Sequence, residues 1–144
     1  MKSLLNHPSP QSKETLKSWL WRLALTNYLD SPRALLKILE QRLPGTVLNW
    51  QQVNIRIRER QVFEALAELT HTSARTVYDH TLHCFAHVLT PPTQSLDWLC
   101  FSGDVSVALL PVKVHRDFHL PRPRWCPDCL VEARMVRLHW HIPP

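Results

Sequence analysis

The chain has 144 residues, 44% of them hydrophobic, which is enough for one domain or two very small ones with a real core. The formal net charge is +5, and nine histidines add positive charge on mild acidification, so polyanions, nucleic acid first, are the expected partners. Only two glycines occur and no glycine-rich phosphate-binding motif is present, which argues against nucleotide binding by this chain alone.

Residues 1–13 are predicted to form a flexible lead-in, because they combine prolines with short polar residues. The apolar start is too short for a signal peptide, and no apolar run approaches membrane-spanning length. We therefore expect a cytoplasmic protein without a membrane partner. In that compartment the four cysteines favour free thiols or metal ligands over disulfides.

A pair of helices is predicted at the start of a helical domain that covers residues 14–90. Residues 14–27 carry apolar side chains at three- and four-residue steps: Leu16, Trp19, Leu20 and Leu23. A second helix begins with Ser31 as N-cap and Pro32 at the first helical position, and it stops before Pro44. The short connection predicts that the two helices pack as a pair.

The next stretch, residues 46–60, alternates apolar and polar side chains as a short strand does, but no partner strand is evident, so a loop is predicted. Helical periodicity resumes at residues 61–69. Ser73 is then expected to cap a helix that runs from residue 74 to about residue 89. Two helices joined by so short a turn have the size of a helix-turn-helix, here residues 61–89.

Two of the three marker positions of a helix-turn-helix match in this segment, and the third, His71, departs from the pattern. Ala67 and Val77 stand where the motif usually has alanine and a branched apolar residue, and His71 stands where it usually has glycine. A histidine can adopt the positive φ angle that such a turn requires, at some cost. The second helix would present its polar side chains outward: Arg75, Thr76, Tyr78, Asp79 and His83.

We expect Arg75, Thr76 and Tyr78 to reach phosphates or base edges. An equally weighted alternative is an ordinary helical hairpin, since Asp79 would be repelled by phosphate. The same predicted helix places His80, His83, Cys84 and His87 on one side, a pattern seen in metal-binding faces. No H-E-x-x-H pair accompanies them, so partly buried polar residues and a buried cysteine are the simpler interpretation.

Residues 91–144 are predicted to form a proline-rich connector and a cysteine-bearing module. Residues 105–110 and 112–114 are candidates for short strands. Arg122 and Arg124, in a stiff Pro-Arg-Pro-Arg run, are candidates for phosphate contacts. Three tryptophans are candidates for protein-partner contacts if they are exposed, and otherwise belong to the core: Trp19, Trp21 and Trp98.

Cys126 and Cys129 form a C-x-x-C pair, the half-site from which zinc ribbons build a tetrahedral shell. The remaining ligands could come from His139 or His141, from Cys84 or Cys100, from a partner, or from further sequence. A reduced pair without metal is the alternative. The predicted fold is therefore mainly α: a helical pair and a helix-turn-helix-like segment, followed by a small zinc-ribbon-like module, either complete or incomplete.

Two motifs, taken together, point to a family. Residues 14–24 read E-T-L-K-S-W-L-W-R-L-A. Residues 126–130 read C-P-D-C-L, and residues 137–143 read R-L-H-W-H-I-P. In this order, around a helix-turn-helix-like segment, the motifs resemble those of the TniQ/TnsD family over nearly the whole chain. The family usually has glycine where His71 stands, and its zinc shell is completed by a later C-x-x-H that the given sequence does not contain.

The resemblance implies a bacterial, nucleoid-associated transposition protein without enzymatic activity of its own. Such proteins help to choose the target site, binding DNA or a guide-RNA target complex and recruiting an AAA+ transposition ATPase. A homodimer is a further option. The alternatives are a helix-turn-helix DNA-binding regulator with a small zinc module, or a truncated TniQ fragment without function. A metal-dependent hydrolase using the helix histidines is disfavoured because no carboxylate lies beside them.

Overall fold

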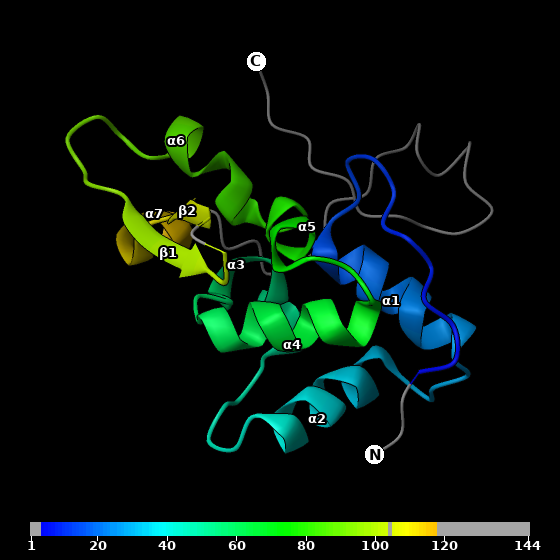
Figure 1. Ribbon diagram of the computed structural model, residues 1–144. Helices are drawn as coiled ribbons and strands as arrows, with labels where there is room; N and C mark the ends of the chain where they lie inside the picture. Colours follow the sequence, from blue (N-terminus) through cyan, green and yellow to red (C-terminus); the bar gives the residue numbers. More distant parts are fainter. Residues whose placement is uncertain (1–3, 104, 118–144) are drawn as a thin grey trace.

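The first two helices form as the periodicity predicts. The computed structural model (Figure 1) describes residues 4–103 and 105–117. Helix α1 (Leu16–Thr26) is capped by the Thr15 side chain, which accepts a hydrogen bond from the Ser18 amide at 3.2 Å. Helix α2 (Pro32–Arg42) starts with proline at its first position, although the Ser31 side chain makes no capping bond. Both helices bury a leucine-rich face in one core.

The segment between α2 and the next long helix contains helical turns, where the sequence predicts a loop. A 3-10 turn, η1 (Trp50–Gln52), leads directly into a short helix, α3 (Val53–Arg56). Val53 and Ile57 are both almost fully buried, at 2% and 3% exposure. They are four residues apart, a spacing that places two side chains on one face of a helix as well as on one face of a strand. Burial of this pair favours the helical conformation here.

Helix α4 (Arg60–Thr70) and helix α5 (Ala74–Asp79) are joined by a three-residue turn. The predicted helix from residue 74 to residue 89 is wrong in its length, because α5 ends at Asp79. After an extended Thr81 (φ −99°, ψ 166°) the chain continues as a 3-10 helix, η2 (Leu82–Phe85), and a short helix, α6 (Ala86–Leu89). The Thr81 hydroxyl donates to the Tyr78 carbonyl at 2.7 Å, which closes α5 and redirects the chain.

A two-stranded antiparallel hairpin follows. Strand β1 (Asp97–Phe101) pairs with β2 (Val105–Leu109), so that Leu99 lies opposite Val107. Residues 97–101 were not predicted as a strand, and residues 112–114, predicted as one, instead begin helix α7 (Val112–Asp117). The hairpin has no other strand in the described residues and gains its stability by packing on helices.

The hairpin belongs to the core of the helical domain. Phe101 packs edge-on against Phe63 of α4, with ring centroids 5.4 Å apart. Val107 and Leu109 lie in the same buried cluster as the helical leucines, and Leu110 joins a second cluster under η2 and α6. Residues 97–110 therefore share a core with residues 14–90, whereas their proline-rich surroundings predict that they belong to a separate C-terminal module.

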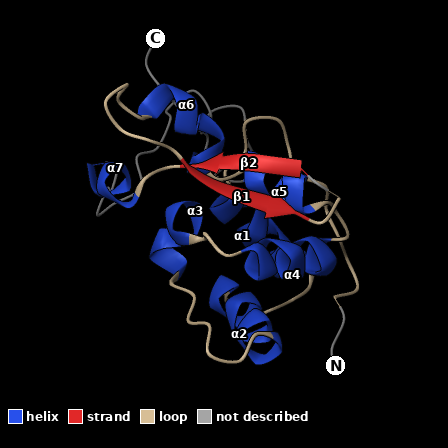
Figure 2. Ribbon diagram, turned by 60° about the vertical axis from the view of Figure 1, so that its left-hand side comes forward, coloured by secondary structure: helices blue, strands red, loops and turns tan. Residues whose placement is uncertain are grey.

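The lead-in also packs against the helices. Leu4 is buried, the Trp19 indole N–H donates to the Pro8 carbonyl at 2.8 Å, and the Asn27 side chain accepts hydrogen bonds from the Leu5 and Asn6 amides at 2.9 Å. In both views α4 lies between α2 and the layer formed by α5 and the hairpin (Figures 1 and 2). Within the described ranges, no helix is long and apolar enough to cross a membrane.

Candidate nucleic-acid interface

The turn between α4 and α5 contains the positive φ angle expected at this position of a helix-turn-helix. His71 adopts a left-handed conformation, with φ 54° and ψ 42°. Its amide donates to the Glu68 carbonyl at 3.3 Å, and the Thr72 amide donates to the Ala67 carbonyl at 2.9 Å. These two bonds form a Schellman motif, which ends α4 and turns the chain sharply. The positive φ angle predicted for His71 is confirmed, and Ala67 and Val77 are both buried where the two helices meet.

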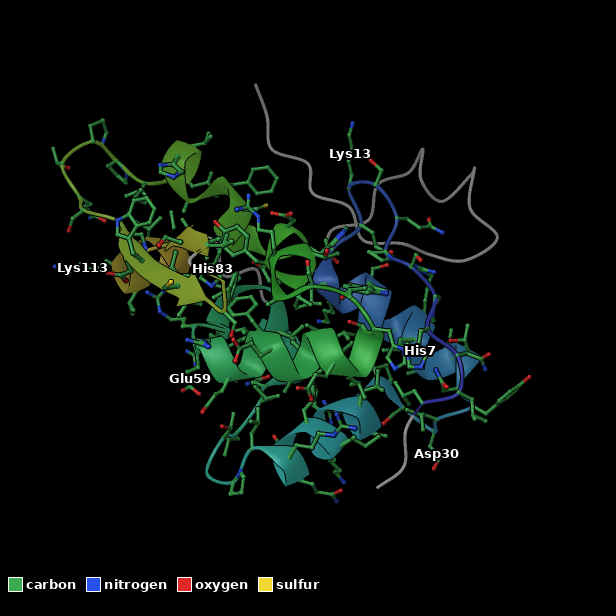
Figure 3. All side chains as sticks on the ribbon, in the orientation of Figure 1. His7, Lys13, Asp30, Glu59, His83 and Lys113 are labelled. Carbon is green, nitrogen blue, oxygen red and sulfur yellow. The ribbon has the colours of Figure 1, made fainter. Side chains whose placement is uncertain are left out.

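His7 of the lead-in braces this turn from outside (Figure 3). Its imidazole stacks on that of His71, with ring centroids 3.7 Å apart and an interplanar angle of 17°. The Nδ1 atom of His7 lies 3.2 Å from the Leu69 carbonyl, to which it donates when protonated at that nitrogen. The stack covers one face of the His71 ring, so contacts with His7 stabilise both the lead-in and the turn.

The outer face of α5 carries one cation and one anion. Arg75 is exposed, and its Nε donates to the Asp79 carboxylate at 2.9 Å, one helical turn further along. Thr76 is half-buried, and its amide and hydroxyl are both within hydrogen-bonding distance of the Ser73 hydroxyl, at 3.0 and 2.9 Å. Arg75 therefore presents a cation to solvent, as predicted, but one that a neighbouring carboxylate partly neutralises.

Tyr78 does not lie on that outer face, which corrects its predicted place in the interface. Only 5% of it is exposed, and its hydroxyl donates to the carbonyls of His83 (2.9 Å) and Ala108 (2.6 Å). Burial, followed by the nearby Cys84, raises the pKa of Tyr78 to about 12. Tyr78 directly follows the buried Val77 and faces the hairpin. Its burial could not be predicted from the sequence, because strand β1 was not predicted.

The predicted histidine face does not exist as one surface, because the helix is broken. The Nδ1 atom of His80 lies 2.5 Å from the Glu14 carbonyl oxygen. The backbone carbonyl of His80 accepts a hydrogen bond from the Leu16 amide at 2.6 Å. His83 is fully buried beside the hairpin (Figure 3), where its Nδ1 accepts from the Leu110 amide at 3.1 Å. Residues 4–103 and 105–117 contain no cluster of three or more potential metal ligands.

The thiol of the half-buried Cys84 is unreactive as a free group. Burial, with a smaller contribution from Asp79, raises its pKa to about 12. A free thiol with so high a pKa stays protonated near neutral pH and is a poor nucleophile.

The groove beside the turn is acidic. It has a volume of about 640 Å³ and runs between α4 and the end of β1, where Glu64 and Glu68 line it. Hydrogen bonds from Ser102 and Arg60 lower the pKa of the exposed Glu64, which favours its charged form. The two carboxylates that line the groove therefore disfavour a polyanion there.

The three candidate tryptophans lie in different environments. Trp19 is fully buried in the core and is not available to a partner, as its position on the apolar stripe of α1 requires. Trp21 is 48% exposed and Trp98 is 61% exposed, the latter with the His87 ring packed edge-on at 5.9 Å. Six predicted site residues lie outside the described ranges: Arg122, Arg124, Cys126, Cys129, His139 and His141.

Sequence reasoning missed the charged pair beneath the opening motif. Glu14, although fully buried, accepts from Arg22 Nε at 2.7 Å and from Arg22 Nη2 at 2.6 Å. The Ser18 hydroxyl donates to the same carboxylate at 3.2 Å, and Arg22 also donates to the Ser9 carbonyl at 2.9 Å. The E-x-x-x-S-x-x-x-R spacing, with each residue one helical turn from the next, was the signal available in the sequence.

Neither a comparison with curated proteins nor one with solved structures gives a match. The family model named TniQ matches residues 5–144, from the packed lead-in through α4 and α5 to the cysteine-bearing end. The protein therefore belongs to the TniQ family.

Proposed function

We propose that this protein is a target-selection adaptor in transposition, acting by binding rather than by catalysis. Membership of the TniQ family associates the chain with transposition. The observation that supports the proposal further is the left-handed Schellman turn at His71, which joins α4 to α5 through three residues, the length of turn that a helix-turn-helix has. In this proposal α5 contacts the target DNA or the target complex, and another surface recruits an AAA+ ATPase.

The nucleic-acid contact is assigned to Arg75, with Thr76 and the turn residue Ser73 beside it. Arg75 is the residue of the α5 outer face that can form a charge-assisted bond to phosphate. Its partner Asp79 weakens this attraction, so affinity contributed by α5 is expected to be moderate and strongly dependent on salt. Arg122 and Arg124 are proposed as further phosphate contacts from the C-terminal segment.

Titration of a fluorescein-labelled DNA duplex at two salt concentrations tests this assignment. Arg75→Ala is expected to weaken binding at low salt and to lower the slope of log K against log salt by about one. Arg56→Ala is the matched control, because Arg56 is also exposed but lies on α3, outside the proposed interface. Curves of Arg75→Ala that superimpose on those of the wild type at both salt concentrations would remove α5 from the interface.

A zinc site at the C-terminal end is the second part of the proposal. Cys126 and Cys129 would provide two thiolates, and His139 and His141 would complete the shell. The support is the C-x-x-C spacing and the position of both pairs inside the matched family range. The role of such a site would be to hold this segment, with its arginines, in one conformation.

A further inference from the structure

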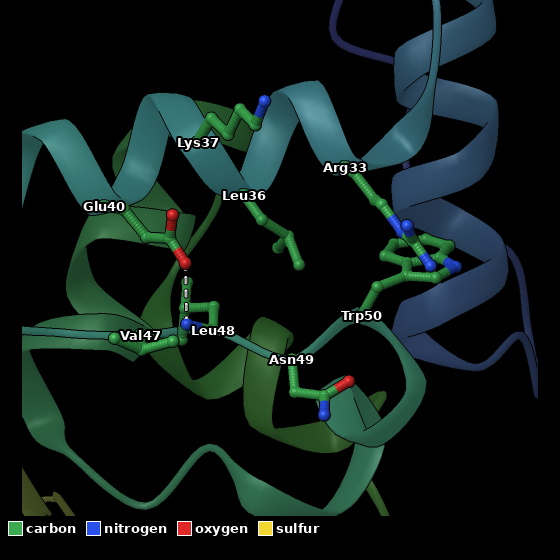
Figure 4. A pocket seen from close by; sticks show the side chains of 8 residues that line it. All are labelled: Arg33, Leu36, Lys37, Glu40, Val47, Leu48, Asn49 and Trp50. Atoms are coloured by element: carbon green, nitrogen blue, oxygen red, sulfur yellow. Dashed lines mark hydrogen bonds between the residues drawn. The ribbon is translucent and has the colours of Figure 1, made fainter.

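A pocket of about 310 Å³ lies between α2 and the segment that precedes η1 (Figure 4). Leu36, 3% exposed, forms its floor together with Leu48 and Trp50. Glu40 of α2 accepts a hydrogen bond from the Leu48 amide at 2.8 Å, which fastens the segment to the helix. The pocket is thus held open by a defined contact, and its volume is at the lower end of the ~300–1,000 Å³ found for binding pockets.

Cations surround this apolar floor. Arg33 and Lys37 line the pocket from α2, and the Lys17 ammonium of α1 lies 5.4 Å from the centroid of the Trp50 ring. None of these three forms an ion pair with any carboxylate of the described residues. Burial lowers the pKa of Lys17, so its charged form would gain from an anion placed close by.

Apolar surface continues outside the pocket. Val47, at the mouth, is 89% exposed, and Trp21 of α1 lies 6.3 Å from Trp50 between ring centroids. A large apolar side chain that enters the pocket would bury both this apolar surface and its own apolar surface, which favours binding. Tryptophan and arginine are also the residue types that most often dominate binding at protein interfaces.

We propose that this pocket binds an acidic segment of a protein partner. One large apolar side chain of that segment would rest against Leu36, Leu48 and Trp50. Carboxylates on either side of it would pair with Arg33, Lys37 and Lys17. The complementarity of both kinds of surface, an apolar floor and an unpaired basic rim, determines the chemistry of the partner.

A nucleic acid fits the same pocket less well. A base stacks on a free ring face, but Lys17 already lies over the Trp50 ring, and Trp21 is tilted to it by 51°. Among the described residues that line the pocket, Trp50 alone is aromatic, so a second base finds no ring there to stack on. Since α4 separates α2 from α5, a peptide in this pocket leaves the α5 face accessible, and the inference does not depend on DNA binding there.

Selection from a library of random peptides displayed on phage, with the full chain immobilised, tests the proposal. Enriched peptides are expected to combine Asp or Glu with Leu, Ile, Phe or Trp. Their synthetic versions should bind Arg33→Glu and Lys37→Glu about tenfold more weakly than the wild type. Lys113→Glu, the same reversal at an exposed lysine of α7, is the matched control and should bind as the wild type does.

Three results would overturn the proposal: no enrichment, enrichment of basic peptides, or binding that both charge reversals leave unchanged. Fluorescein-labelled oligo(dT) is the counter-probe. If it binds the wild type, loses affinity in Arg33→Glu, and no acidic peptide is enriched, the pocket is a nucleic-acid site. Arg75→Ala should retain the enriched peptides, so a failure of the DNA-binding proposal is distinguished from a failure of this one.

Discussion

Glu14 and Arg22 form a buried two-point ion pair, with both carboxylate oxygens bonded to one guanidinium at 2.7 and 2.6 Å. The pair joins the residue before α1 to the middle of that helix. Through Arg22 it also holds the lead-in, because the same guanidinium donates to the Ser9 carbonyl. In this chain the motif at residues 14–24 therefore stabilises the fold, because it fixes both α1 and the lead-in.

Replacing Arg22 by methionine is expected to lower the free energy of unfolding by about 3–5 kcal/mol, because the fully buried Glu14 loses its counter-ion. Urea denaturation followed by circular dichroism measures the change. Arg56→Met, at an exposed arginine of α3, should change the free energy of unfolding by no more than about 0.5 kcal/mol. The double variant Glu14→Gln/Arg22→Met should recover part of the loss. Equal stability of the two arginine variants would contradict the role given to the pair.

The contribution of the Glu14 carboxylate to the free energy of unfolding should disappear in acid. Burial raises the pKa of Glu14, but hydrogen bonds from Arg22 and from the Gln11 amide, with the charge of Arg22, lower it by more, so the folded-state pKa lies below the ordinary 4.5. The folded chain then binds fewer protons than the unfolded chain below about pH 4.5, and stability falls with the pH there.

The stability difference between the wild type and Glu14→Gln measures this effect. It should be constant between about pH 7 and pH 5, and should shrink as the pH falls through the lowered pKa. Denaturation of both proteins at pH 7 and at pH 3.5 provides the comparison. A difference of the same size at both values would show that the carboxylate does not titrate with a lowered pKa.

His71→Gly should be more stable than His71→Ala by about 1 kcal/mol, because glycine adopts the left-handed conformation without steric cost. Both variants lose the stack on His7, so the difference between them measures the free-energy cost of the left-handed backbone conformation. At His87, which lies inside α6, the order should reverse, since glycine destabilises a helix interior relative to alanine. Thermal denaturation of the four variants tests both orders, and the same order at the two sites would refute the explanation.

Asp79→Asn should tighten binding to a DNA duplex, with the largest gain at low salt. The substitution frees Arg75 from its ion pair and removes one negative charge from the face that meets phosphate. Arg75→Ala/Asp79→Asn should bind more weakly than Asp79→Asn alone. Fluorescence anisotropy provides the affinities, and Glu59→Gln, an exposed acid before α4, is the control for a general loss of negative charge. Equal gains for Asp79→Asn and Glu59→Gln would assign the effect to net charge alone.

The purified chain is expected to contain about one zinc ion, and Cys126→Ser should lose it. Metal analysis by mass spectrometry, after removal of loosely bound ions, gives the ratio. Cys100→Ser removes an exposed thiol of β1 and should retain the metal. No zinc in the wild type would mean that the C-x-x-C pair is an open half-site, and zinc lost equally from both variants would place Cys100 in the shell.

The sequence by itself determined the elements whose signals are local. The apolar stripe of α1, the proline that begins α2 and the cap at Ser73 are read from neighbouring residues. Helices α2 and α5 start at the predicted residues, and α1 starts two residues later than predicted, at Leu16. The motifs at both ends of the chain identify the family for the same reason, because each is a fixed order of residues over a short distance.

Only the tertiary structure decided which polar residues face solvent. Tyr78 is buried because β2 supplies an acceptor for its hydroxyl, and His83 is buried because Leu110 supplies a donor for its ring. The partner atoms lie 30 and 27 residues further along the chain, respectively, in β2 and in the residue that follows it. Whether such a segment is extended or helical depends on its packing. Contacts between distant segments outweigh local preference there, because burial of a polar group without a partner costs more than the propensity of any one residue.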